Sequence, residues 1–194
     1  SGTHVANYMN GVDMRKVTMF THGNIKVDCT SPLYYSVEPL GGTAIVMPDV
    51  QNKTILEANL AVVIGYYNAV RVGEHYNANK LVFAGCLNGL VSPDSATSSH
   101  SITINHLLIE ACKNSILLEG SDQEFNIFLY DTERYNGANW YSFESDIKKT
   151  GGTCKVNIFN SKVVTSGGGT DPFTVSGAPY YRILTGNGAN AGLI

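Results

Sequence analysis

Acidic side chains recur at similar distances after an asparagine in three parts of the chain. Glu74 and Asp94 each lie six positions after an Asn, and Glu119 lies five positions after one. In stacked parallel strands, carboxylates at such positions lie about 4.8 Å apart, or twice that across two strands. Glycoside hydrolysis uses two carboxyl groups about 5–9.5 Å apart. The spacing therefore predicts a catalytic acidic row on one outer face, with His75 and His100 close to it and His75 binding substrate. The open alternative is that these residues only begin the loop after each strand.

A second candidate site is an acidic and aromatic segment further along the chain. Asp131 and Glu133 alternate onto one face of an expected strand, where the carboxylates form a candidate catalytic pair with one pKa raised by the other. Trp140 and Tyr141 follow, and aromatic rings with a polar rim suit stacking on sugars. We expect these two residues and Arg134 to bind a saccharide. The open alternative is a wide loop of core aromatics in which Arg134 pairs with a local carboxylate.

The other reactive side chains lack the spacing of known sites. The cysteines stand at positions 29, 86, 112 and 154, without the CxxC spacing of a zinc site, and no HExxH or HxH segment occurs. The Gly-rich segments lack the patterns that bind phosphates at the start of a helix. We therefore expect no metal, no cofactor and cysteines that stay reduced.

The composition bounds the class of protein. A chain of 194 residues fits one domain. Charged residues make up only 15%, against about 25% in typical soluble domains, and 18 Asn and 20 Gly take their place. The net charge of −3 argues against binding of nucleic acid, which needs a basic surface. The longest apolar stretch, Leu60 to Gly65, is too short for membrane insertion.

The elements that would position these side chains are strands. Helical periodicity is nearly absent, and its best exception is His106 to Lys113. Short runs rich in branched and aromatic residues are separated by Gly, Asn, Ser and Pro, which favour turns. The chain is therefore predicted to be all-β. The expected strands are 44–47, 54–56, 60–64, 69–72, 80–83, 101–104, 115–118, 125–130, 155–159, 162–165 and 181–184.

A repeat sharpens the fold. Asn68, Asn88 and Asn114 are each followed by a small residue and then a branched apolar one, and weaker copies stand at Asn136 and Asn160. The gaps of 20, 26, 22 and 24 residues average 23. Such a period with short strands and no helices is typical of a parallel β-helix, in which each coil stacks on its neighbours. The Asn side chains then hydrogen-bond up the stack, and the thiols of positions 86 and 112 become inward neighbours.

A β-sandwich or jelly roll with Asn-Gly hairpins is the alternative fold. It predicts mostly antiparallel strands. Hairpins of that kind join equal strands, whereas these turns recur singly, once in about 23 residues. The repeat therefore favours the β-helix.

The spacing of apolar and small residues in Lys80–Ser92 and Ile102–Gly120 resembles that in the coils of right-handed, pectate-lyase-like β-helix proteins. Among these proteins, the resemblance is to bacteriophage tailspikes and related polysaccharide depolymerases. The resemblance covers about Lys53 to Tyr181. It implies a homotrimer that recognises bacterial surface polysaccharide, capsule or O-antigen, and in many members hydrolyses it, in a virion tail or outside the cell. The paired aspartates of plant-wall pectinases do not occur, so pectinolytic chemistry is not expected.

The resemblance also divides the chain. We expect an irregular N-terminal segment or cap over residues 1–50, β-helix coils over 51–181 and a C-terminal tail over 182–194. Family members usually begin with a capping helix, which residues 1–50 lack, so either this irregular segment covers the end of the stack or the chain is a piece of a longer spike. The contrasting hypothesis for function is a non-enzymatic structural or receptor-binding segment of a viral tail fibre.

Overall fold

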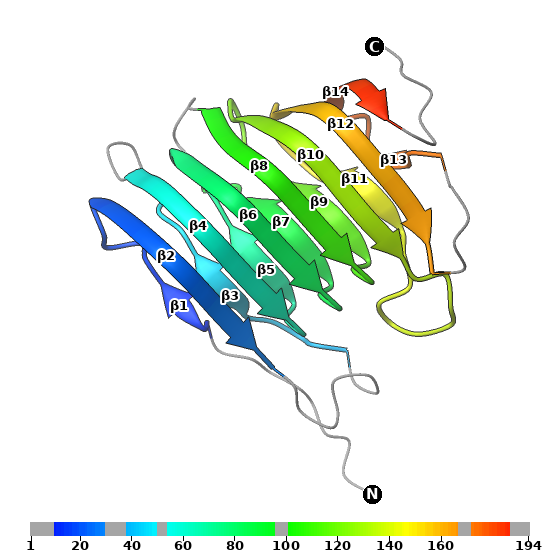
Figure 1. The fold of residues 1–194 in the computed structure, drawn as a ribbon, viewed down its shortest axis with the longest axis horizontal. Coiled ribbons are helices and arrows are strands. Elements are labelled where there is room, and N and C mark those ends of the chain that lie inside the picture. The colour runs from blue at the N-terminus through cyan, green and yellow to red at the C-terminus, as the bar shows by residue number, and fades with distance from the viewer. Residues whose placement is uncertain (1–9, 30–37, 50–53, 96–100, 167–171, 187–194) are drawn as a thin grey trace, which may run out of the picture.

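A computed structural model describes residues 10–29, 38–49, 54–95, 101–166 and 172–186, and all its regular elements are strands. The all-β prediction is confirmed. The strands form two seven-stranded sheets, one behind the other (Figure 1). The first sheet holds β1 (Val12–Asp13), β3 (Thr43–Val46), β5 (Asn68–Arg71), β7 (Asn88–Ser92), β9 (Asn114–Leu118), β11 (Ser145–Lys149) and β13 (Val175–Ser176). The second sheet holds β2 (Met19–Asp28), β4 (Thr54–Ile64), β6 (Tyr76–Ala84), β8 (Ser101–Glu110), β10 (Glu124–Arg134), β12 (Lys155–Thr165) and β14 (Tyr180–Gly186).

The chain alternates between the two sheets. Each strand pairs with the second strand after it, and every pairing among the described residues is parallel. The antiparallel hairpins of a sandwich are therefore not found in this part of the chain. Each return to a sheet adds one strand beside the previous one, so equivalent side chains line up in rows.

The core lies between the sheets and is built from such rows. β8 buries two pairs of side chains, first Ile102 and Ile104 and then Leu107 and Ile109. The two members of each pair face the core because alternate side chains of a strand point the same way. Between these pairs the alternation breaks, and Asn105 and His106 both face outward. The same break occurs at the matching place in β6 and β10. The long strands therefore bend at one shared row.

The asparagine repeat holds for its strong copies and fails for its weak ones. Asn68, Asn88 and Asn114 are register partners in the first sheet, and the row runs from Thr43 to Ser145. The separations along the row are 25, 20, 26 and 31 residues. The copies at 136 and 160 are wrong, because residue 136 lies in the loop after β10 and residue 160 lies on β12 of the second sheet. That loop lengthens the turn, and a serine takes the expected place of asparagine.

Hydrogen bonds link this row from strand to strand. Nδ2 of Asn88 donates to Oδ1 of Asn68 at 2.9 Å, and Nδ2 of Asn114 donates to Oδ1 of Asn88 at 3.0 Å. The Ser145 hydroxyl donates to Oδ1 of Asn114 at 3.0 Å. The predicted stacking of asparagine side chains is confirmed.

The cysteines pack as expected. Cys86 and Cys112 are buried, and the backbone N–H of Cys86 lies 3.4 Å from the Cys112 sulfur. All four cysteines are free thiols. Both lie in turns, Cys86 between β6 and β7 and Cys112 between β8 and β9, and inward packing there explains why both sites carry a small apolar side chain.

The expected domain boundaries do not coincide with changes in structure. β1, β2 and β3 lie before residue 50, so the described part of 1–50 belongs to the two sheets. β14 runs across the expected boundary at 181. The best helical candidate, 106–113, is the end of β8 and the turn after it. β2 and β11 were not expected, because their sequences MFTHGNIKVD and SDIKK are polar.

Candidate functional site

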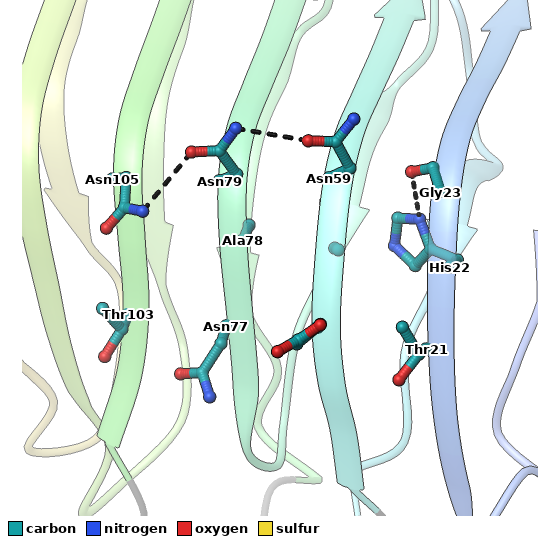
Figure 2. Close-up of a pocket in the computed structure, with 11 residues that line it drawn as sticks. Thr21, His22, Gly23, Asn59, Asn77, Ala78, Asn79, Thr103 and Asn105 are labelled. Carbon is teal, nitrogen blue, oxygen red and sulfur yellow. Dashed lines mark hydrogen bonds between the residues drawn. The ribbon is translucent and has the colours of Figure 1, made fainter.

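A groove of about 500 Å³ lies on the outer face of the second sheet, over β2, β4, β6 and β8 (Figure 2). Exposed, mostly small and polar side chains line it, and the buried His22, Ala58 and Ala78 lie between them. We call it the amide groove. Its lining residues are Thr21, His22, Gly23, Glu57, Ala58, Asn59, Asn77, Ala78, Asn79, Thr103 and Asn105.

A ladder of exposed asparagines runs along one side of the groove. Nδ2 of Asn59 donates to Oδ1 of Asn24 at 2.8 Å, and Nδ2 of Asn79 donates to Oδ1 of Asn59 at 3.3 Å. Asn105 donates to Asn79 at 3.4 Å (Figure 2). Each amide in the middle of the ladder keeps one N–H and one oxygen lone pair for a ligand. The groove thus offers a donor and an acceptor at every strand, about 4.8 Å apart.

The groove carries little acid–base chemistry. Glu57 is exposed and is the one carboxylate in the lining. His22 is buried, with its ring nitrogens 3.3 Å from the Tyr76 hydroxyl and 3.2 Å from the Gly23 carbonyl oxygen. Burial lowers the pKa of His22, so the imidazole is neutral at pH 7. Glycoside hydrolysis usually needs two carboxyl groups, and the groove is therefore suited to binding.

The predicted acidic row does not form as expected, because Glu74 points inward. Its side chain is 1% exposed and its Oε1 lies 2.7 Å from Nδ1 of His75. The half-exposed His75 is therefore engaged by this carboxylate just before the start of β6. His100 lies outside the described residues.

Asp94 and Glu119 remain neighbours on the first sheet, after β7 and β9. Burial raises the pKa of Glu119, the charge of Asp94 raises it further, and Arg71 opposes the shift. Nη2 of Arg71 lies 3.5 Å from Asp94 and donates to the Ser95 hydroxyl at 3.0 Å. Two of the three predicted carboxylates thus come together around an arginine.

Asp131 and Glu133 do share the outer face of β10, as their alternation predicted. Asp131 lies 3.8 Å from Nε2 of His106 and 3.7 Å from Nζ of Lys162. Glu133 is exposed and lies in register with Glu110 of β8. Each of the two carboxylates therefore has a different set of neighbours.

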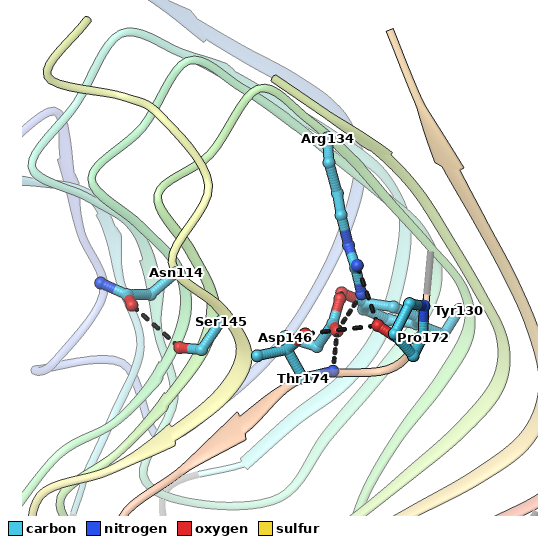
Figure 3. A network of polar contacts seen from close by, with 7 residues as sticks. All are labelled: Asn114, Tyr130, Arg134, Ser145, Asp146, Pro172 and Thr174. Carbon is cyan, nitrogen blue, oxygen red and sulfur yellow. Dashed lines mark hydrogen bonds and ion pairs between the residues drawn. The ribbon is translucent and has the colours of Figure 1, made fainter. Parts of the chain in front are cut away.

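Arg134, which was predicted to bind a saccharide, has a buried side chain. The guanidinium pairs with Asp146 and donates to the Pro172 carbonyl at 3.0 Å (Figure 3). It also stacks 4.1 Å from the Phe143 ring centroid. Both charged side chains are at most 1% exposed. The alternative in which Arg134 pairs with a local carboxylate is confirmed.

The aromatic residues after β10 pack against one another. Tyr141 is 7% exposed, and its ring centroid lies 5.2 Å from that of Trp140 and 4.9 Å from that of Tyr135. Asn139 donates to the hydroxyls of both tyrosines, at 2.9 and 3.1 Å. Tyr141 therefore offers little surface to a sugar, and Trp140 is half-buried beside it.

The groove residues themselves were missed, although the sequence holds a signal for them. Asn59, Asn79 and Asn105 each stand nine positions before a strong repeat asparagine, and the ladder has the same separations of 20 and 26 residues. A second conserved offset within one repeat is the mark of a second row in the stack. Only the alternation of β4, β6 and β8 shows that this row faces outward.

Comparison with protein-family models, curated proteins and solved structures finds no match to this chain. Within the described ranges, no helix is long and apolar enough to cross a membrane. No group of three metal-ligating His, Cys, Asp or Glu side chains occurs in the same ranges.

Proposed function

We propose that this chain is a tailspike-like, right-handed parallel β-helix that recognises a bacterial surface polysaccharide through the amide groove. The observation that carries the proposal is the exposed row of Asn59, Asn79 and Asn105, linked by hydrogen bonds. Sugars present paired hydroxyls that donate and accept, which matches the free donor and acceptor of each amide. The regular alternation of the chain between two parallel sheets supports stacked coils.

The test is binding of the purified chain to a panel of capsular polysaccharides and O-antigens. Asn79→Ala removes the middle amide of the row, and we expect at least a fivefold loss of affinity. Asn160→Ala is the matched control, since Asn160 is also exposed on the second sheet but lies outside the groove. Equal loss in both variants, or no loss in either, contradicts the assignment to this groove.

Hydrolysis is a second candidate function, favoured by Asp94 and Glu119. A general acid at neutral pH needs a raised pKa, and burial and the neighbouring Asp94 raise the pKa of Glu119. Asp94→Asn and Glu119→Gln should each abolish release of reducing ends from the bound polysaccharide. Binding without release by the unmodified chain favours the non-enzymatic fibre segment.

The homotrimer and the virion-tail or extracellular location rest on the resemblance. Native mass measurement tests the first, because a trimer has three times the 20.9 kDa of one chain. A stable monomer contradicts the trimer and weakens the tailspike proposal.

A further inference from the structure

A second hollow lies on the outer face of the second sheet, at its other end. It measures about 350 Å³ over β10, β12 and β14. Its lining contains two cations, Lys155 and Arg182, which are both exposed. We call it the basic cleft. Its lining residues are Glu124, Lys155, Val156, Asn157, Tyr180, Tyr181 and Arg182.

The basic cleft and the amide groove share one row of side chains. Asn77 and Thr103, which line the groove, are register partners. From Thr103 the row continues through Asn126 and Asn157 to Arg182. Nδ2 of Asn157 donates to Oδ1 of Asn126 at 2.9 Å, so the amide pattern extends toward the cleft. A linear polymer that follows the row therefore reaches both hollows.

The polar groups of the cleft favour an anion. Lys155 is a register partner of Tyr180, and Arg182 is a register partner of Asn157. A third cation, Lys149 of β11, is not part of the lining but lies 5.6 Å from the Tyr180 ring centroid. The one carboxylate of the lining, Glu124, accepts a hydrogen bond from Nδ2 of Asn157 at 2.9 Å. The cleft thus carries an excess of positive charge on a chain of net charge −3.

We propose that the basic cleft binds the carboxylate of an acidic sugar in the same polysaccharide that occupies the amide groove. The planar fork of Arg182 matches a carboxylate with two parallel hydrogen bonds, and Lys155 adds a point charge. Tyr180, which is 61% exposed, gives the sugar ring an apolar surface beside these charges. The inference rests on the proposed function and defines its substrate as an acidic polysaccharide rather than a neutral one.

The experiment compares one acidic capsular polysaccharide with the same polymer after its carboxylates have been reduced to alcohols. The full chain should bind the acidic polymer about tenfold more tightly. Arg182→Gln should remove most of that difference, because the charged hydrogen bonds to the carboxylate are lost. Lys155→Gln should lose less. Lys162→Gln is the control, since Lys162 is an exposed cation of β12 outside the cleft.

The outcomes separate this inference from the proposed function. If the reduced polymer binds as tightly as the acidic one, or Arg182→Gln binds like the unmodified chain, the acidic subsite is wrong. If Asn79→Ala still weakens binding in that case, the amide groove stands. If no acidic or neutral polysaccharide of the panel binds, both proposals are wrong. A phosphate-substituted polymer that binds in place of the carboxylated one overturns the choice of carboxylate.

Discussion

The Arg134 guanidinium is paired with the Asp146 carboxylate inside the protein, between the end of β10 and the start of β11 (Figure 3). Asp146 also accepts hydrogen bonds from the Tyr130 hydroxyl at 2.7 Å and from the Thr174 backbone N–H at 2.7 Å. Burial raises the pKa of Asp146, and Arg134 and these donors oppose the shift. The pair thus joins β10, β11 and the segment before β13.

Removal of one member of this pair should strongly destabilise the protein. Arg134→Met leaves a buried carboxylate without its cation, and such single removals cost about 3–5 kcal/mol. Urea unfolding measures the loss. The exposed pair of Lys148 and Glu144 gives the control, because Lys148→Ala should cost about 0.5 kcal/mol or less. Similar losses in the two variants would show that the buried pair has no special role.

The two asparagine ladders should respond differently to the same substitution. Asn88→Ala removes the partner of Oδ1 of the half-buried Asn68 and of Nδ2 of the buried Asn114, which should cost about 1–3 kcal/mol. Asn79→Ala acts on the exposed ladder and should change the free energy of unfolding by about 0.5 kcal/mol or less. Thermal and urea unfolding distinguish the ladder that stabilises the fold from the ladder that we assign to ligand binding.

Stability should fall as the pH decreases below the ordinary histidine pKa of 6.5. Because burial lowers the pKa of His22, the folded state binds fewer protons than the unfolded state between 6.5 and the lower folded value. The free energy of unfolding therefore decreases as the pH falls through that window. Above the window, the stabilisation that comes from neutral His22 is fully present. Urea unfolding between about pH 5 and 7.5 should show a smaller dependence in His22→Gln than in the unmodified chain. His106, whose pKa is also lowered by burial, contributes in the same direction.

Gly152 should not tolerate a side chain. Its φ of +59° is unfavourable for other residues, and an added Cβ would lie 1.6 Å from the Gly120 carbonyl oxygen. Gly152→Ala should cost about 1–3 kcal/mol or more. Gly23→Ala is the control, because an added Cβ there meets nothing within 4 Å. Melting temperatures that drop equally in both variants would contradict the steric explanation.

Much of the fold follows from local patterns in the sequence. The branched runs predict the strands, and the strong asparagine repeat predicts which strands stand beside one another, as Asn68, Asn88 and Asn114 do. Less of the candidate site could be predicted from the sequence. Glu74 and Asp94 are both six positions after an asparagine, yet one is buried and the other is 81% exposed. Spacing sets the row of a residue, but the path of the turn sets the direction of its side chain.

The sequence by itself determined an all-β chain with an approximate period, because strand propensity and turn residues act over a few neighbouring positions. Only the tertiary structure decided which polar residues are available to a ligand. Arg134 is buried in a pair with Asp146, twelve positions away. Asn79 lies on the outer face because of the alternation of β6, and Arg182 because of the register of β14. Burial and strand register depend on contacts between segments that are distant in the chain, so neither can be derived from the type of a single residue and its local neighbours.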